Sequence, residues 1–123
     1  MATIKTGAVV ISWGPGIPGR ERRMLEVLRQ VLAYAERLVA QGRIEEVLFF
    51  VAKTGPNRDT LMLRGDLETL AALLAGDEFE GYRQDGMLVV QDLQVALWAG
   101  GNPRAVTDGV GEHAAKLRAH ELV

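Results

Sequence analysis

The segment Gly14–Gly19 has the glycine spacing of dinucleotide-binding loops, G-x-G-x-x-G. In such loops the glycines let the backbone approach a pyrophosphate, and free N–H groups at the start of the next helix hold the anion. Here Pro15 and Pro18 lie inside the motif, and proline has no N–H to donate. The segment therefore predicts either a nucleotide contact or a stiff turn between a strand and a helix.

The residues that follow do not supply the rest of a dinucleotide site. Such a site needs a second strand parallel to the first, with a carboxylate near its C-terminal end to hold the ribose. The second predicted strand, Ile44–Ala52, instead has its acidic residues, Glu45–Glu46, at its start and Lys53 after its end. We therefore interpret the glycine segment as a rigid corner, with Arg20 at its exit as a candidate contact for a small anion.

Other catalytic constellations are weak. The chain has no cysteine, which removes thiolate metal sites and a cysteine nucleophile. His113 and His120 are the only histidines and lie seven residues apart, wider than usual metal-binding pairs and without an evident third ligand. Ser12 lacks the G-x-S-x-G setting of a nucleophilic serine. We therefore predict no metal site and no cofactor.

Aromatic and polar side chains could instead line a small pocket between helices and sheet. Arg64 is the most informative of them, because it ends an apolar strand and could bind an anionic ligand, although pairing with Asp66 is the simpler interpretation. The aromatic members could equally be ordinary core residues. The candidate cleft residues are Trp13, Tyr34, Phe50, Arg64, Tyr82 and Trp98.

The elements that would position these residues follow the order βαββαβ. Apolar positions three and four apart predict an amphipathic helix from Arg20 to Gln41. The connection between the second and third strands has about seven residues, too short for a parallel crossover, so these strands should be antiparallel. A second helix should begin after Asp66 as its N-cap and end at Gly76. The predicted strands are Ala8–Trp13, Ile44–Ala52, Thr60–Arg64, and Met87–Trp98 with a bend at Gln91–Asp92. The pattern also predicts one further helical turn at Asp77–Glu80 and a tail helix at Asp108–Glu121.

Short sequence matches support this layout. The runs Ser12–Pro15, Pro18–Glu21, Gly42–Glu45, Arg64–Asp66 and Asp77–Phe79 resemble a family of short bacterial proteins of unknown function. The layout as a whole resembles the dimeric α/β-barrel superfamily. The resemblance implies an α+β, ferredoxin-like domain over residues 1–101, with a four-stranded antiparallel sheet, two helices on one face and a homodimer. It implies no reaction or catalytic residue, and it leaves the tail, residues 102–123, outside.

The strand composition supports a dimer independently. Two helices can cover one face of a four-stranded sheet, yet the predicted strands are apolar on both faces: Val47, Phe49 and Val51 alternate with Leu48 and Phe50. A second copy of the chain is the simplest cover for the other face. The C-terminal segment folding back is the alternative.

Charge and composition restrict the partners. The net charge is −2, which argues against broad nucleic-acid binding, and the third strand lacks the aromatic residues of an RNA-recognition motif. No apolar run approaches the roughly 20 residues that span a bilayer, and no secretory signal is evident. We expect a cytoplasmic protein whose partners are a second copy of itself and a small apolar or anionic ligand.

Three functions agree with this pattern. The first is a non-catalytic homodimer that binds a small molecule or has a regulatory role. The second is a cofactor-independent monooxygenase-like enzyme acting on an aromatic or quinol-like substrate, which would need a polar group to ionise that substrate. The third is a protein-interaction subunit. The candidate polar groups for the enzyme are Tyr34, Arg64, Asp66 and Tyr82.

Overall fold

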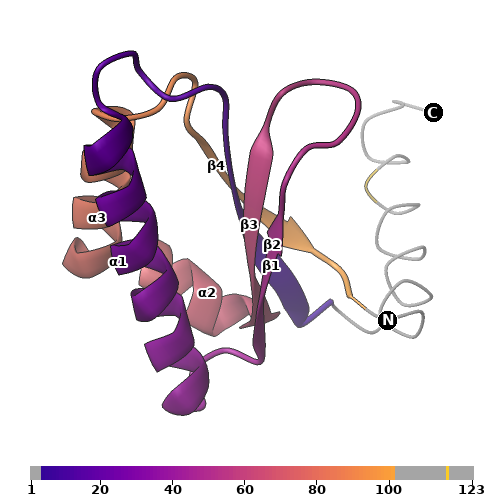
Figure 1. Cartoon of the computed structure of the whole chain (residues 1–123). Coiled ribbons are helices and arrows are strands. Elements are labelled where there is room, and N and C mark those ends of the chain that lie inside the picture. Colours follow the sequence, from indigo (N-terminus) through magenta and orange to yellow (C-terminus); the bar gives the residue numbers. More distant parts are fainter. Residues whose placement is uncertain (1–3, 102–115, 117–123) are drawn as a thin grey trace.

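The computed structural model describes residues 4–101 and residue 116. Its elements alternate much as the sequence predicts, with one additional helix (Figure 1). The predicted tail helix lies outside the described residues apart from residue 116. The elements in chain order are β1 (Thr6–Trp13), α1 (Glu21–Ala40), β2 (Glu46–Phe50), β3 (Asp59–Asp66), α2 (Leu67–Leu74), α3 (Asp77–Met87) and β4 (Gln94–Ala99).

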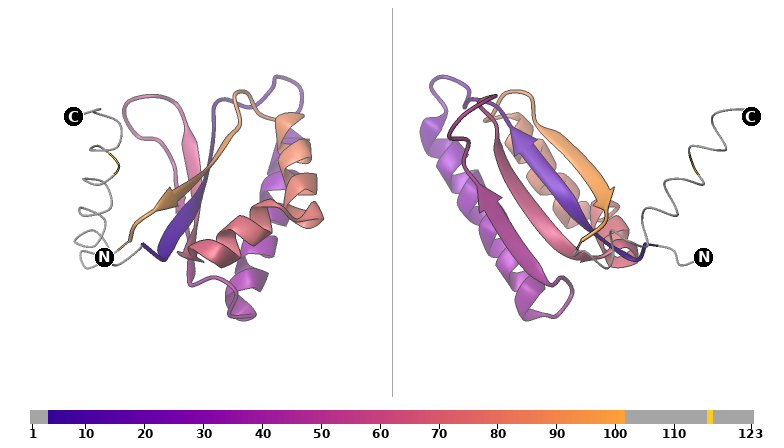
Figure 2. Two further views of the ribbon diagram at one scale, coloured as in Figure 1. Left: turned by 180° about the vertical axis from the view of Figure 1, so that it is seen from behind. Right: turned by 90° about the vertical axis from the view of Figure 1, so that its right-hand side faces the viewer.

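The four strands form one antiparallel sheet in the order β2-β3-β1-β4. The central strand β1 pairs with β3 along its whole length, from Thr6 opposite Asp66 to Trp13 opposite Asp59, and with β4 on its other side. The pairing of β2 with β3 is antiparallel, as the short connection predicts. All three helices lie on one face of the sheet (Figures 1 and 2). The ferredoxin-like fold is therefore confirmed.

The second helical region is longer than predicted. Asp66 is the N-cap of α2 and accepts a hydrogen bond from the Thr69 N–H at 3.2 Å, which confirms that prediction. Beyond Gly76, however, α3 runs for 11 residues instead of one turn. Its first turn is acidic, which favours a helix N-terminus, and Phe79 anchors it in the core. The sheet is thus covered by three helices rather than two.

The prediction of a strand at Met87–Val90 is wrong. Met87 ends α3, and the N–H groups of Val89 and Val90 both donate to the Gly86 carbonyl at 3.0 Å. Asp92 then takes a left-handed conformation with φ 51°, and β4 begins only at Gln94. The two valines are 2% and 8% exposed, so their apolar character serves burial in a connecting segment and not sheet pairing.

The helices approach the sheet closely at one end only. There α2 packs on β1, β3 and β4, whereas α3 packs on α1 and α2. A side-chain carbon at Gly7 would lie 2.0 Å from the Trp98 carbonyl oxygen and 2.6 Å from Leu67 Cδ2, so this contact between β1, β4 and α2 requires glycine. At the end of β1 near Trp13, α1 and α3 stand further from the strands (Figure 1).

The core is apolar throughout. Among the described residues no polar or charged residue is buried, and no buried side-chain nitrogen or oxygen lacks a hydrogen bond. The fully buried residues Val9, Leu61, Leu63 and Leu70 join β1, β3 and α2. Within residues 4–101, no helix has the length and apolarity needed to cross a bilayer.

Candidate functional site

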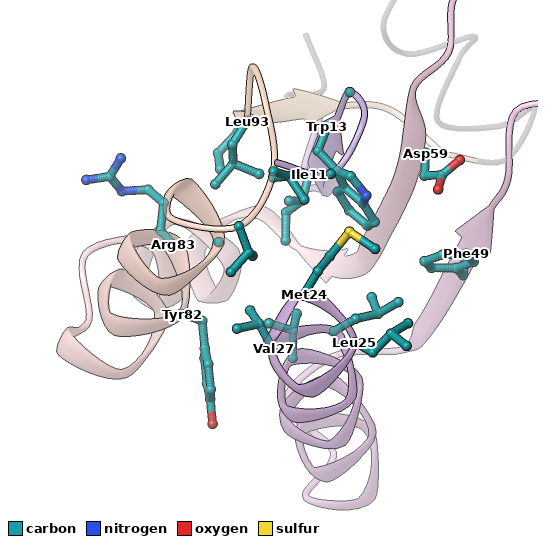
Figure 3. A pocket seen from close by; sticks show the side chains of 18 of the residues that line it. Ile11, Trp13, Met24, Leu25, Val27, Phe49, Asp59, Tyr82, Arg83 and Leu93 are labelled. Carbon is teal, nitrogen blue, oxygen red and sulfur yellow. The ribbon is translucent and has the colours of Figure 1, made fainter. Parts of the chain in front are cut away.

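A cavity of about 430 Å³ lies between the sheet, α1 and α3. This volume falls in the range of roughly 300–1,000 Å³ that small-molecule sites occupy. Figure 3 shows side chains from the sheet, from α1 and from the connecting loops around one space, with Tyr82 and Arg83 of α3 beside it and the Arg83 guanidinium directed outward. The cavity occupies the end of the molecule where the helices diverge from the strands.

The periodicity of α1 supplies one wall. Its lining residues recur three and four positions apart, so they share one face of the helix, and that face is directed at the sheet. The sheet supplies the opposite wall through alternate positions of its strands. The lining residues from α1 include Met24, Val27, Leu28, Val31 and Tyr34, and those from the sheet include Ile11, Trp13, Phe49, Leu63 and Val95.

Two aromatic rings and a carboxylate mark the end of the cavity near the strand termini. The rings of Trp13 and Phe49 lie 6.0 Å apart at an angle of 49°. Asp59 lies directly opposite Trp13 in the β1–β3 pairing, and its Oδ1 accepts a hydrogen bond from the Ala52 N–H at 3.2 Å. Figure 3 shows these three side chains on the same side of the cavity. We call this group, Trp13, Phe49 and Asp59, the cavity mouth.

A second polar group lies between α1 and α3. The rings of Tyr34 and Tyr82 are 5.0 Å apart, and the Arg37 guanidinium lies 5.4 Å from the Tyr34 ring centre. Arg37 also pairs with Glu78 at 2.5 Å. Burial, followed by the negative charge of Glu78, raises the pKa of Tyr34 above its ordinary value of 10.0. The Tyr34 hydroxyl therefore stays protonated at neutral pH and cannot act as a base.

The structure brings three of the six predicted cleft residues to the cavity: Trp13, Tyr34 and Tyr82. The other three, Phe50, Arg64 and Trp98, lie on the opposite face of the sheet, since neighbouring positions of a strand face opposite ways and Phe49 and Leu63 face the helices.

Arg64 does not pair with Asp66 as predicted. It pairs with Glu46, which lies opposite it in the β2–β3 pairing, while the Asp66 carboxylate caps α2. Neither Arg64 nor Asp66 lines the cavity. Of the four polar groups considered for ionising a substrate, Tyr34 and Tyr82 therefore line the cavity, and the raised pKa of Tyr34 removes it as a base.

Sequence reasoning missed Phe49, Met24 and Asp59. Phe49 and Phe50 are adjacent and equally apolar, so the sequence did not indicate which of them faces the helices. Asp59 follows the turn-forming residues 54–57 and had the appearance of a loop residue. The strand alternation could have placed Asp59 on the helical face, because Asp59 lies an even number of positions before Leu61 and Leu63 and so shares their face of the sheet.

The glycine segment forms a corner bonded to the chain between α3 and β4. The Gly14 N–H donates to the Gln91 carbonyl at 2.9 Å, and the Ile17 N–H donates to the Val89 carbonyl at 2.8 Å. The Gly19 N–H donates to the Glu21 carboxylate at 3.1 Å, and backbone hydrogen bonds of this kind lower the pKa of Glu21. These N–H groups bond within the protein, as a structural corner requires.

Arg20 lies at the exit of this corner, and its guanidinium donates to the Leu88 carbonyl. Within the described residues no group of three or more histidine, cysteine, aspartate or glutamate residues could hold a metal ion. His113 and His120 lie outside the described residues.

Comparison with known proteins bears on the fold. No family model and no curated protein matches the sequence. Among solved structures, a candidate antibiotic biosynthesis monooxygenase from Bacteroides thetaiotaomicron superposes with a TM-score of 0.56 and 16% identity, over 80% of this chain and 90% of that chain. The chain shares its ferredoxin-like fold with this structure.

Two further structures agree. SnoaB, a cofactor-independent oxygenase from Streptomyces nogalater, has a TM-score of 0.56 and 11% identity over 80% of this chain and 95% of that chain. A Pseudomonas aeruginosa protein has a TM-score of 0.56 and 12% identity over 82% of this chain and the whole of that chain. At these identities the likeness establishes the fold, and activity must be argued from the site.

Proposed function

We propose that this protein binds a flat, largely apolar small molecule in the cavity between α1, α3 and the sheet. The observation that carries the proposal is the cavity itself: about 430 Å³ bounded almost entirely by apolar side chains. Cores are normally packed without voids of this size. An apolar cavity with a few polar groups at its ends is the common form of a ligand site.

Filling the cavity tests this proposal. Val31 lies on α1 and lines the cavity, so Val31→Phe should occupy part of the ligand's space. Val39 is on the same helix, is 37% exposed and does not line the cavity, which makes Val39→Phe a matched control. We expect naphthylethanol, measured by calorimetry, to bind wild type and Val39→Phe alike and Val31→Phe at least about tenfold more weakly. Equal binding to all three proteins would place the probe elsewhere.

We also propose that the protein is a homodimer joined through the sheet face opposite the helices. Phe50 and Trp98 on that face are 53% and 55% exposed, and apolar neighbours such as Leu48, Met62 and Ala96 share the face by their register. Exposed aromatic side chains of this kind are typical of interface anchors. A two-fold contact would cover the same patch on both copies.

Light scattering on sized fractions tests the dimer. We expect wild type to have twice the chain mass, Trp98→Glu to be a monomer, and Val39→Glu, on the helical side, to remain a dimer. A chain ending at Gly101 should also remain a dimer. If that shortened chain dimerises while the full chain is a monomer, residues 102–123 cover the face and the proposal is wrong.

The second candidate function is a cofactor-independent oxygenase acting on an aromatic or quinol-like substrate. It is favoured by the fold shared with SnoaB together with the Asp59 carboxylate at the cavity mouth, which is placed to accept a proton from a bound hydroxyl. Oxygen consumption with naphthalenediol, corrected for its spontaneous oxidation, tests this activity. Catalysis should be lost in Asp59→Asn; a rate equal to the uncatalysed one in wild type excludes it for this substrate.

A further inference from the structure

The Asp59 carboxylate is an acidic group in a cavity lining that is mostly apolar. It stands on the face of the sheet directed at the helices, next to Trp13 in the pairing of β1 with β3. Its hydrogen bond from the Ala52 N–H involves Oδ1 alone. A carboxylate has room for about four hydrogen bonds. Asp59 thus has accepting capacity that the described residues do not use.

No cation of the described residues forms an ion pair with Asp59. Arg58 is adjacent in sequence, but it binds Asp92 at 2.6 Å and the Ser12 hydroxyl at 3.0 Å. Arg83, the cation that does line the cavity, is held by both carboxylate oxygens of Glu80 at 2.5 and 2.7 Å. The Asp59 carboxylate at the mouth therefore forms no ion pair with a side chain of the described residues.

The groups around Asp59 are suited to a positive charge. The face of an aromatic ring attracts a cation, and Trp13 and Phe49 stand at an angle of 49° with their centres 6.0 Å apart. Trp13, Phe49 and Asp59 all line this cavity, and a carboxylate together with aromatic rings is a combination that binds ammonium groups. An anionic ligand would be repelled by the Asp59 carboxylate at the same place.

We propose that the cavity mouth recognises the positively charged amine end of a ligand whose apolar body fills the cavity. The ligand class is therefore an arylalkylamine or a similar hydrophobic ammonium ion, with its charge between Trp13, Phe49 and the Asp59 carboxylate. This inference rests on the proposed function, since it names the ligand class of the same cavity. It assigns Asp59 as the residue that determines specificity.

Three probes with the same apolar body test the inference: naphthylethylammonium, naphthylethanol and naphthylacetate, titrated into the full chain by calorimetry at constant ionic strength. We expect the ammonium probe to bind about tenfold more tightly than the alcohol, and the carboxylate to bind most weakly. Asp59→Asn should bring the ammonium probe to the affinity of the alcohol and leave the alcohol unchanged. The asparagine oxygen can still accept the Ala52 N–H, so the strand terminus keeps its hydrogen bond.

Asp92→Asn is the matched control. Asp92 is an acid paired with Arg58 and 64% exposed at its side chain, and asparagine tolerates its left-handed backbone. This variant should keep the preference for the ammonium probe. Equal binding of ammonium and alcohol to wild type, or an equal loss of preference in both variants, would refute the inference while leaving the cavity as a ligand site. Failure of all three probes to bind would refute the proposed function as well.

Discussion

Replacing Gly7 by alanine should destabilise the protein more than replacing any other glycine of the sheet by alanine. The new carbon would lie 2.0 Å from the Trp98 carbonyl oxygen, well inside the contact distance. That oxygen belongs to the backbone of β4, which pairs with β1 at Gly7 and Ala99. The clash can be relieved only by moving β4 away from β1 at this end.

The magnitude follows from the bonds at stake. Moving β4 weakens the hydrogen bonds that join Thr6 to Gly100, one from the Gly100 N–H to the Thr6 carbonyl and one from the Thr6 hydroxyl to the Gly100 carbonyl, both at 2.9 Å. Each is worth about 1 kcal/mol, and the overpacking adds roughly 1–3 kcal/mol. We expect a loss of about 3–5 kcal/mol in the free energy of unfolding, which lowers Tm by roughly 10–20 °C.

Urea unfolding followed by circular dichroism measures this loss, with Gly81→Ala as the control. Gly81 is an exposed residue inside α3, and an added carbon there meets nothing within 4 Å. Alanine should stabilise the helix at that position by roughly 0.5–1 kcal/mol. If Gly7→Ala lowers the free energy of unfolding by less than about 1 kcal/mol, the close approach of β1, β4 and α2 does not depend on this glycine, and the prediction is wrong.

Three further predictions concern the cap, the core and the buried phenol. Asp66→Ala removes the acceptor for the Thr69 N–H and should cost about 1 kcal/mol in urea unfolding, whereas Asp66→Asn should cost less because asparagine also caps helices. Leu61→Ala empties a fully buried position between β1 and β2 and should cost roughly 2–5 kcal/mol; a smaller loss would mean that the neighbouring side chains collapse into the space. Because the pKa of Tyr34 is raised in the folded protein, its contribution to stability is complete below the unfolded value of 10.0 and is lost as pH rises through the folded value. Absorbance titration of the wild type should show a phenol that ionises above the ordinary value of 10.0 and is missing in Tyr34→Phe.

The sheet was predictable because its determinants are local. Apolar runs marked the strands, and the short connection before Asp59 required β2 and β3 to be antiparallel. The cap at Asp66 followed from residue type alone. The segment Met87–Val90 could not be placed by the same reasoning, since β-branched residues indicate burial as much as a strand. Its hydrogen bonds to Gly86 and to the glycine corner decide its conformation.

The candidate site was only half predictable for a different reason. Both faces of the sheet are apolar, so the alternation that normally distinguishes the inner from the outer face is weak. The face of each residue is fixed by the register, in which Trp13 stands opposite Asp59 and Phe49 opposite Leu61. Register is a tertiary property, and composition does not contain it. Phe50 and Trp98 were therefore grouped with residues on the other side of the sheet.

The glycine corner lies at the end of the molecule where the helices diverge from the sheet. Its backbone pairs with the chain that links α3 to β4, through Gly14 with Gln91 and through the Gln91 N–H with the Pro15 carbonyl at 2.9 Å. These bonds join the β1–α1 connection to the α3–β4 connection at the cavity end of the molecule, where Gly14, Pro15 and Gly16 line the cavity. A side-chain carbon at Gly16 would lie 2.8 Å from Met24 Sδ, so glycine leaves that methionine its place in the cavity wall. Residues spaced as in a phosphate-binding loop thus close an apolar cavity, and the Gly14 and Ile17 N–H groups bond to the neighbouring connection between α3 and β4.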